Sequence, residues 1–397
     1  MSLEPSRRTF LAASGLGLAG MAGCLGNSGG SDGSDGSDGG GSTSTGTEMD
    51  ADTNATSGDS TRAAGSGSTA AANDEYSTDT SALPTREEPL PVEWPFSQLR
   101  DRTRSGGPPK DGIPSVDEPS FWSVSGADEF LAPGDVVFGV AGEEDVKAYP
   151  QRILVWHEIA NDTVDGDPVS VTYCPLTGTA MGFFRGETEF GVSGNLVNSN
   201  LVMYDRETDS RWPQVLGTAM SGPFQGQSLT EFPVTWTTWG EWKAAHPETV
   251  VLSEDTGHVR NYSRDPYGAY NPAQGYYANS NTLFSPLSRD DRHHPKDVVV
   301  GARPVEGSIA FLKESLRDEG LVTGAVGGAT FHAVYDPALD TAHVYRGDGT
   351  DLSYADGQAS VGGETFAPGA LPLERVIDLD AMWFAWAGFY PRTVVVE

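Results

Sequence analysis

Short apolar runs separated by turn residues fill most of the chain after residue 134. Residues 136–140 are apolar, a Gly-Glu-Glu turn follows, and 146–149 resumes the pattern, which predicts a β-hairpin. Pro150 suits the first position of a helix because its φ is already fixed. Beyond it, side chains recur three and four residues apart, as on one helical face that ends before Asn161-Asp162: Ile153, Trp156, His157 and Ala160.

A second hairpin is predicted around Pro175. Residues 169–174 read as a strand that ends at Cys174, the next residues supply turn chemistry, and 179–184 reads as the returning strand. Related elements recur farther along the chain: hairpins at 202–209 and 334–340, and Trp-x-x-Trp helices, each followed by a turn and a β-branched strand, at 239–251 and 383–395.

Two stretches of the chain match each other without a gap. Residues 135–180 align with 297–342, and a second block that begins at Trp239 recurs from Trp383. The identities include Asp135 with Asp297, Gly139 with Gly301, Leu154 with Leu316, Tyr173 with Tyr335 and Pro175 with Pro337. Such self-similarity predicts a degenerate tandem duplication. Residues kept in both copies are then scaffold, and chemistry found in one copy is a candidate for function.

The predicted fold is therefore α+β and β-rich, with two tandem degenerate repeats of mostly antiparallel strands and short helices. The chain is predicted to consist of a signal segment at 1–24, a Gly/Ser/Asp tether at 25–85, an extended Pro-rich lead-in at 86–134, repeat one at 135–251, an inserted polar-aromatic loop at 252–296 and repeat two at 297–397.

The N-terminus predicts export. Arg7-Arg8 precede an apolar, Gly-rich run too short to span a bilayer, which is the pattern of a twin-arginine signal. A small residue precedes Cys24, as in a lipobox, so Cys24 is the predicted lipid attachment that holds the protein on the outer face of the cell membrane. A signal that is cleaved without lipidation is the alternative. The tether lacks residues that could form a core.

The chain is strongly acidic, with 56 Asp and Glu against 25 Lys and Arg and a net charge of −31. This composition resembles that of halophilic, and in particular haloarchaeal, proteins. At molar salt the Debye length is about 3 Å, so the repulsion between these charges is largely screened. Because no basic stripe is present, nucleic acid is excluded as a predicted partner.

Chemistry that differs between the copies centres on Cys174. In the alignment, three residues of repeat one are replaced by chemically different residues in repeat two: His157 aligns with Glu319, Glu158 with Gly320 and Cys174 with Asp336. We therefore predict that Cys174, His157 and Glu158 are catalytic residues. With Cys24 lipidated, Cys174 is a lone thiol, either functional or buried and inert.

A cysteine and a histidine can also hold a soft transition metal, copper or zinc, so Cys174 and His157 are the predicted metal ligands. Two ligands are too few for a structural zinc site, and Thr177 stands where a Cys-x-x-Cys motif has its second cysteine. A third ligand would come from Glu158, His246, His258, His293 or His294. The site is predicted to bind such a metal or to perform thiol redox chemistry. Alternatively, Cys174 and His157 only fill the core.

The 252–296 loop, which has no counterpart after repeat two, supports a different hypothesis. It is rich in Tyr, Asn and Arg, and long loops of this kind are often functional. The protein would then be a non-catalytic binding module that recognises a carbohydrate or peptide through Arg260, Tyr262, Arg264 and Tyr267. A surface loop without a ligand is the remaining alternative. We expect the loop to lie over a groove between the repeats, beside the Cys174 hairpin.

Several long motifs resemble the domain-of-unknown-function family 3179: Ala148-Tyr149-Pro150, Trp156-His157-Glu158-Ile159, Thr172-Tyr173-Cys174-Pro175-Leu176, Asn198-Ser199-Asn200-Leu201 and Arg264-Asp265-Pro266-Tyr267. The match runs from about Gly112 to the C-terminus. The family's turn is commonly Cys-Pro-Leu-Cys-Gly-Thr, so the resemblance implies that Thr177 removes any dithiol mechanism here. It implies membership and no established activity.

Overall fold

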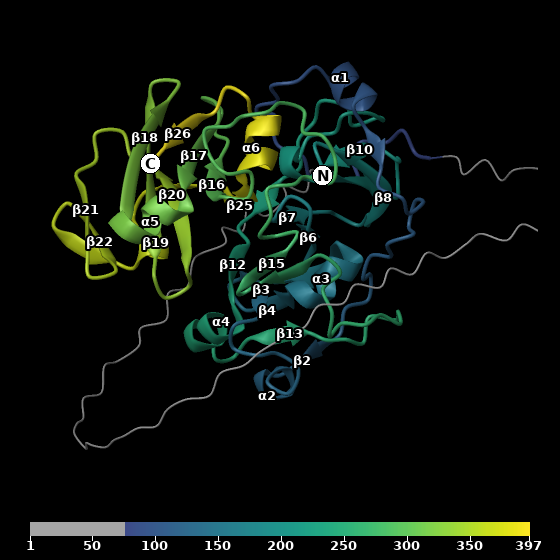
Figure 1. Ribbon diagram of the computed structural model, residues 1–397, viewed down its shortest axis with the longest axis horizontal. Helices are drawn as coiled ribbons and strands as arrows, with labels where there is room; N and C mark the ends of the chain where they lie inside the picture. Colours follow the sequence, from purple (N-terminus) through teal and green to yellow (C-terminus); the bar gives the residue numbers. More distant parts are fainter. Residues whose placement is uncertain (1–75) are drawn as a thin grey trace, which may run out of the picture. The chain divides into compact units, whose positions relative to one another are not determined.

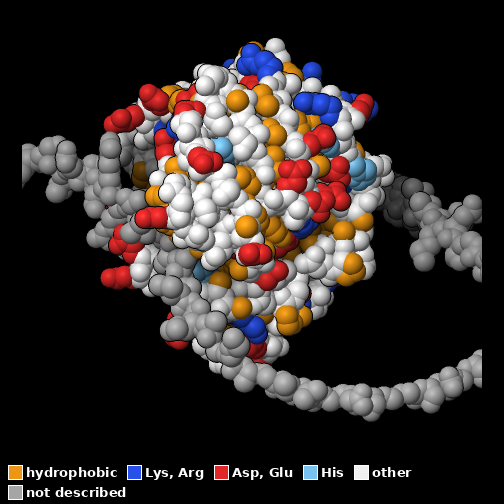
Figure 2. Space-filling model, turned by 90° about the vertical axis from the view of Figure 1, so that its left-hand side faces the viewer, with side chains coloured by type: hydrophobic (Ala, Val, Ile, Leu, Met, Phe, Trp, Pro, Cys, Tyr) orange, Lys and Arg blue, Asp and Glu red, His pale blue; other side chains and the backbone are white. Residues whose placement is uncertain are grey.

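The computed structural model describes residues 76–397 and is β-rich, with several mostly antiparallel sheets and few short helices (Figure 1). The predicted twin-arginine signal, the lipid attachment at Cys24 and the tether as far as residue 75 lie outside the described residues. Within the described part, no helix is long and apolar enough to cross a membrane. On the face in Figure 2, acidic side chains are spread widely and basic ones are fewer.

The elements of residues 135–251 and 297–397 follow the same order. The first set is β3 (Val136–Ala141), β4 (Val146–Pro150), α3 (Gln151–His157), β5 (Ile159–Val164), β6 (Asp167–Cys174), β7 (Thr179–Phe184), β11 (Glu231–Phe232), β12 (Thr235–Thr238), α4 (Trp239–Ala245) and β13 (Val250–Leu252). The second set is β16 (Val298–Ala302), β17 (Ile309–Leu312), α5 (Lys313–Glu319), β18 (Leu321–Val326), β19 (Ala329–Asp336), β20 (Thr341–Arg346), β24 (Glu374–Val376), β25 (Asp378–Met382), α6 (Trp383–Phe389) and β26 (Val394–Val396).

The strand order and register also correspond. One sheet reads β12-β3-β4-β13 in the first block and β25-β16-β17-β26 in the second, and the other reads β11-β7-β6-β5 and β24-β20-β19-β18. Gly139 lies opposite Ala148, as Gly301 lies opposite Ala310. The two blocks therefore share one topology, and their descent from one ancestral unit stays our interpretation.

The remaining elements elaborate this plan. They are α1 (Phe96–Asp101), β1 (Arg104–Ser105), β2 (Phe121–Trp122) and α2 (Val124–Ala127) in the lead-in, β8 (Phe190–Val197), β9 (Asn200–Asp205), β10 (Arg211–Pro213) and η1 (Gln214–Leu216) within the first block, β14 (Gly268–Tyr270) and β15 (Ala273–Gly275) in the 252–296 loop, and β21 (Leu352–Ala355), β22 (Gln358–Val361), β23 (Glu364–Phe366) and η2 (Pro368–Ala370) within the second block.

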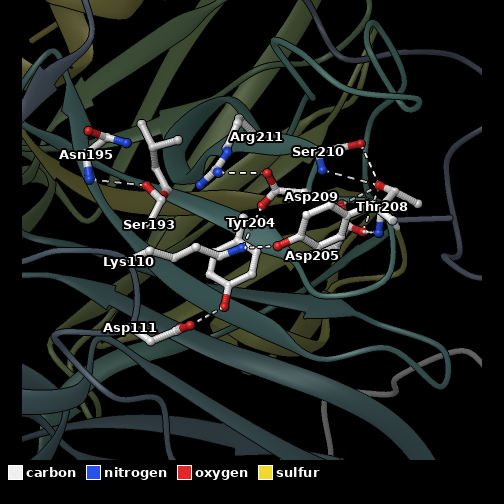
Figure 3. Close-up of polar contacts among 12 residues, drawn as sticks. Lys110, Asp111, Ser193, Asn195, Tyr204, Asp205, Thr208, Asp209, Ser210 and Arg211 are labelled. Atoms are coloured by element: carbon white, nitrogen blue, oxygen red, sulfur yellow. Dashed lines mark hydrogen bonds and ion pairs between the residues drawn. The ribbon is translucent and has the colours of Figure 1, made fainter. Parts of the chain in front are cut away.

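The lead-in runs along the first block and contains two short helices, so it is not extended throughout. Its strand β1 pairs with β8 and its strand β2 with β13. Lys110 places its Nζ 3.9 Å from the centre of the Tyr204 ring on β9, and the Tyr204 hydroxyl donates to Asp111 (Figure 3). These contacts fasten the lead-in to the β8–β9 face.

The predicted helix after Pro150 is shorter than its hydrophobic pattern implied. It ends at His157, and Ala160 belongs to strand β5. Glu158 adopts a left-handed conformation with φ 59°, which stops the helix. Ala160 is buried in the core as part of strand β5, so it only happens to continue the spacing of three and four residues seen in the helix.

The two blocks pack on each other through equivalent strands. Strand β25 contacts β7, and β12 contacts β20. Glu231 of β11 forms a buried ion pair with Arg303, which follows β16. One hydrophobic cluster contains both Cys174 and the α6 residues Trp383 and Trp386, so the core is continuous across the two blocks.

Each block is organised by a tryptophan that lies over a glycine. A Cβ added to Gly139 would overlap the indole of Trp242, and one added to Gly301 would overlap Trp386. Each indole also donates to a threonine near the end of its block, Trp242 at 3.0 Å and Trp386 at 2.9 Å. As expected, both Trp-x-x-Trp pairs are fully buried. The matching glycines and tryptophans are therefore scaffold.

We expect Gly139→Ala to lower the free energy of unfolding by about 1–3 kcal/mol or more, because the new methyl group displaces a buried ring. The matched control is Gly134→Ala, where an added Cβ meets no atom within 4 Å. Denaturant unfolding of both variants measures the difference. Equal stability of the two variants would show that the Trp–Gly contact does not constrain the sheet.

Candidate functional site

The β6–β7 hairpin places Cys174 at its turn, with Cys174 paired to Thr179. The thiol is buried, accepts a hydrogen bond from the Leu201 backbone N–H at 3.3 Å and donates to the Ser199 carbonyl at 3.7 Å. Burial, followed by the nearby Glu158 carboxyl, raises the pKa of the Cys174 thiol to about 11. The sulfur is therefore a protonated thiol at neutral pH and joins two turns of the fold.

The facing turn is the two-residue connection between β8 and β9. Asn198 and Ser199 both have positive φ, 57° and 62°, which suits a tight hairpin. The Asn198 amide donates to the Ala385 carbonyl at 2.7 Å and accepts from the Leu287 N–H at 2.8 Å. This turn therefore links the Cys174 hairpin to helix α6 and to the 252–296 loop.

A buried polar network lies beneath the Cys174 turn. Asn200 donates to Thr177 at 3.0 Å and to Gln214 at 2.9 Å, and Gln214 donates to Thr172 at 3.0 Å. Thr179 donates to Gln214 at 2.6 Å. All five side chains are buried. Sequence reasoning missed Asn200 and Gln214, because nothing local to either residue indicates that they meet the turn.

His157 is turned toward other partners. Its Nδ1 lies 2.7 Å from the Pro114 carbonyl, so that nitrogen donates, and its Nε2 lies 2.6 Å from the Tyr262 hydroxyl. Burial lowers the pKa of His157 to about 4, so the ring is neutral. Both nitrogens are engaged, and within residues 76–397 no hydrogen bond connects His157 to Cys174.

The donor set does not fit copper or zinc. Across the described residues, no three His, Cys, Asp or Glu side chains converge as metal ligands would. A metal ligand must also offer a free nitrogen lone pair, and that of His157 faces Tyr262. We therefore derive no chemistry through a metal at the predicted pair.

Among the predicted catalytic residues, Glu158 is the one whose carboxyl acts electrostatically on Cys174, because it adds to the rise in the pKa of the thiol. Its φ of 59° lies in the left-handed region, where the equivalent residue of the second block is Gly320 with φ 74°. Burial raises the pKa of the Glu158 carboxyl to about 8. A bulky residue in a strained, buried position often marks function, so Glu158 stays a candidate acid beside the thiol.

The 252–296 loop covers the Cys174 turn with tyrosines. Tyr276 donates to the Leu176 carbonyl at 2.7 Å, and Tyr270 and Tyr277 stack with ring centres 3.8 Å apart. The Tyr277 hydroxyl donates to Asp265 at 2.8 Å, and this hydrogen bond holds the stacked ring in place. The loop lies beside the Cys174 hairpin, as we expected, and leaves the thiol 1% exposed.

The four predicted ligand-binding residues do not form one surface. Tyr262 is buried against His157, and Tyr267 is half-buried against the hydrophobic cluster that contains Cys174. Arg264 is exposed, and its carbonyl accepts from the Trp156 indole at 3.1 Å. The guanidinium of Arg260 donates to the carbonyl of the preceding residue, Val259, at 3.0 Å. Two of the four thus hold the loop in place.

A cavity of about 310 Å3 lies between the two blocks and the loop, and we call it the junction pocket. Its walls include three aromatic rings and several charged side chains: Trp236, Tyr270, Tyr277, Glu241, Lys296, Lys313, Arg317, Asp340 and Asp380. Sequence reasoning missed Lys296 as a site residue. The available signal was the position of a lysine, rare in this acidic chain, at the end of the aromatic loop.

Lys296 is distinguished by its environment. The residue is 8% exposed, and its Nζ lies 3.1 Å from the centre of the Tyr276 ring and 4.9 Å from that of Phe384. The ammonium makes no hydrogen bond within the described residues. Burial lowers the pKa of Lys296 to about 7.

Residues 110–393 match the model of a family described as proteins of unknown function (DUF3179), and the chain belongs to this family. Neither a curated protein nor a solved structure matches the chain.

We expect Cys174 to resist alkylation in the folded protein. At pH 8 a pKa of about 11 leaves at least about 100-fold less thiolate than the ordinary pKa near 8.5, and the loop blocks access. Iodoacetamide labelling followed by peptide mapping separates Cys174 from Cys24. Unfolding in denaturant should restore rapid reaction, and comparable rates in both states would contradict the buried thiol.

We expect Glu158→Gln to gain stability relative to the wild type as the pH rises. The wild-type carboxyl ionises near 4.5 when unfolded and near 8 when folded, so its contribution to stability is lost between these values. The difference between variant and wild type should grow by up to about 1.4 kcal/mol per pH unit there. The exposed Glu187→Gln is the control, and a pH-independent difference for Glu158→Gln would refute the raised pKa.

Proposed function

We propose that the protein is an exported, lipid-anchored binding protein whose junction pocket takes a small ring-bearing carboxylate. Export and anchoring rest on the Arg7-Arg8 and Cys24 pattern. Binding, rather than thiol redox or metal chemistry, is favoured because the Cys174 thiol is protonated and covered and because His157 is engaged elsewhere.

The observation that carries the proposal is the unpaired Lys296 ammonium. The other charged groups that line the pocket have partners. Lys313 pairs with Asp380 at 2.6 Å, and Arg317 pairs with Asp340 at 2.6 Å. Glu241 accepts from Thr238 at 2.7 Å as part of a helix cap. Burial without hydrogen bonds lowers the pKa of Lys296 to about 7, so an anionic ligand would supply the missing partner and favour the protonated amine.

The pocket walls indicate the rest of the ligand. Trp236 lies edge-on to Tyr270, with ring centres 5.1 Å apart, and Tyr270 stacks on Tyr277. Such rings present flat apolar faces to a planar or sugar ring. The volume of about 310 Å3 lies at the lower end of the range for small-molecule sites. The shared chemistry is one compact ring that carries one carboxylate, either an acidic sugar or an aromatic acid.

We expect glucuronate or benzoate to bind, and their neutral counterparts glucose and benzamide to bind more weakly. Lys296→Met keeps the apolar stem of the side chain. It should lower the affinity for the carboxylate ligand by about 10–100-fold, which corresponds to the free energy of a charge-assisted hydrogen bond. It should leave the neutral ligands unchanged. Isothermal titration calorimetry measures both, and the two ligand pairs tell a sugar site from an aromatic site.

Lys243→Met is the matched control, because Lys243 pairs with Asp128 outside the pocket. Thermal unfolding verifies that each variant is folded. Equal carboxylate affinity in wild type and Lys296→Met, or no binding of either carboxylate, would overturn the proposal.

A further inference from the structure

The second block carries a cavity of its own at the turn equivalent to that of Cys174. Asp336 pairs with Thr341 across β19 and β20, as Cys174 pairs with Thr179 across β6 and β7. In the first block, β8, β9 and the 252–296 loop close over the turn. In the second block, the shorter β21–β23 sheet takes the place of β8–β10, and a cavity of about 350 Å3 remains, which we call the second-repeat pocket.

The pocket has an apolar wall built from both blocks. Trp242 comes from helix α4 of the first block, and Leu339 and Pro368 come from the second. Leu339 also packs against the cluster that contains Trp242. This wall suits an aliphatic or aromatic group of modest size.

Three polar side chains that interact with one another also line the pocket: Asp336, His343 and Arg375. Arg375 donates to His343 Nδ1 at 2.9 Å, which leaves the proton of the neutral ring on Nε2. Burial and the adjacent Arg375 lower the pKa of His343, so the ring stays neutral. His343 Nε2 lies 3.7 Å from Asp336 Oδ2, too far for a hydrogen bond. The histidine thus stands between a carboxylate and a guanidinium without neutralising either.

Both charged groups have unused hydrogen-bonding capacity. Asp336 Oδ1 accepts from the Ala338 N–H at 3.0 Å, and no hydrogen bond to Oδ2 is present among the described residues. The Nε of Arg375 is buried and has no hydrogen-bond partner there. Arg375 also forms a long ion pair with Asp378, whose Oδ2 lies 3.9 Å from the guanidinium and whose pKa burial raises.

We propose that the second-repeat pocket binds a free apolar α-amino acid. Arg375 receives the carboxylate of the ligand, Asp336 receives its ammonium group, and the side chain packs against Trp242, Leu339 and Pro368. A zwitterion matches a guanidinium and a carboxylate that lie on either side of a neutral imidazole ring. This inference does not depend on the junction pocket, because the two cavities share no lining residue.

The test uses calorimetry with L-leucine and two analogues that each lack one charged group, 4-methylpentanoate and 3-methylbutylamine. The wild type should bind leucine at least about 10-fold more tightly than either analogue, since each charged contact contributes about 1.5–3 kcal/mol. Asp336→Asn should weaken leucine by about 10-fold or more and leave 4-methylpentanoate unchanged. Arg375→Met should weaken leucine and leave 3-methylbutylamine unchanged.

The asparagine variant can keep the turn, because its side-chain oxygen can still accept from the Ala338 N–H. Asp356→Asn, in the exposed β21–β22 turn, is the matched control and should bind leucine as the wild type does. Binding of a ring carboxylate at the junction pocket should be unaffected by Asp336→Asn, which separates the two proposals. The inference is overturned if leucine binds the wild type no more tightly than its analogues do. It is also overturned if Asp336→Asn still prefers leucine to 4-methylpentanoate, or if Arg375→Met still prefers leucine to 3-methylbutylamine.

Discussion

In each half of this protein, the packing of one tryptophan indole against one glycine of the sheet positions the surrounding elements. Trp242 can lie flat over Gly139, and Trp386 over Gly301, only because a glycine lets the ring approach the strand. Each contact sets the distance between a short helix, α4 or α6, and the sheet on which it packs. Helix α6 is then positioned to accept from Asn198, and the Met382 N–H just before it donates to the Thr177 carbonyl at 3.0 Å. The surroundings of the Cys174 turn therefore depend on a contact made in the other block.

The two turns show how one backbone can serve two purposes. Cys174 and Asp336 have the same place in the same hairpin, yet different segments surround them. Around Cys174, the β8–β9 turn, the Asn200–Gln214 network and the tyrosines bury the thiol. Around Asp336, the smaller β21–β23 sheet leaves a cavity. The chemistry available at each turn follows from these insertions more than from the hairpin.

Electrostatics single out the same places. In a chain with a net charge of −31, basic side chains are scarce and most described ones are paired with carboxylates. Lys296 forms no ion pair among the described residues and borders a cavity, and Arg375, whose Nε is buried without a hydrogen-bond partner, borders another. Burial without compensation is costly in a folded protein. Such groups are therefore informative about ligands in a way that the many surface acids are not.

The sequence by itself determined the β-rich class, the hairpins, the matching blocks and the family, because strand periodicity, turn residues and repeated Trp and Gly positions are local patterns. It also put Cys174 at a turn and the 252–296 loop beside it. It could not determine side-chain direction: Pro114 and Tyr262, both far from His157 in the chain, hold that ring away from Cys174. The sequence could not show that α3 ends at Glu158, because this end depends on a left-handed backbone conformation that glycine usually adopts. The pockets, and the buried Lys296 Nζ and Arg375 Nε without hydrogen-bond partners beside them, were decided only by tertiary structure, because a cavity exists where segments distant in sequence fail to fill the space between them.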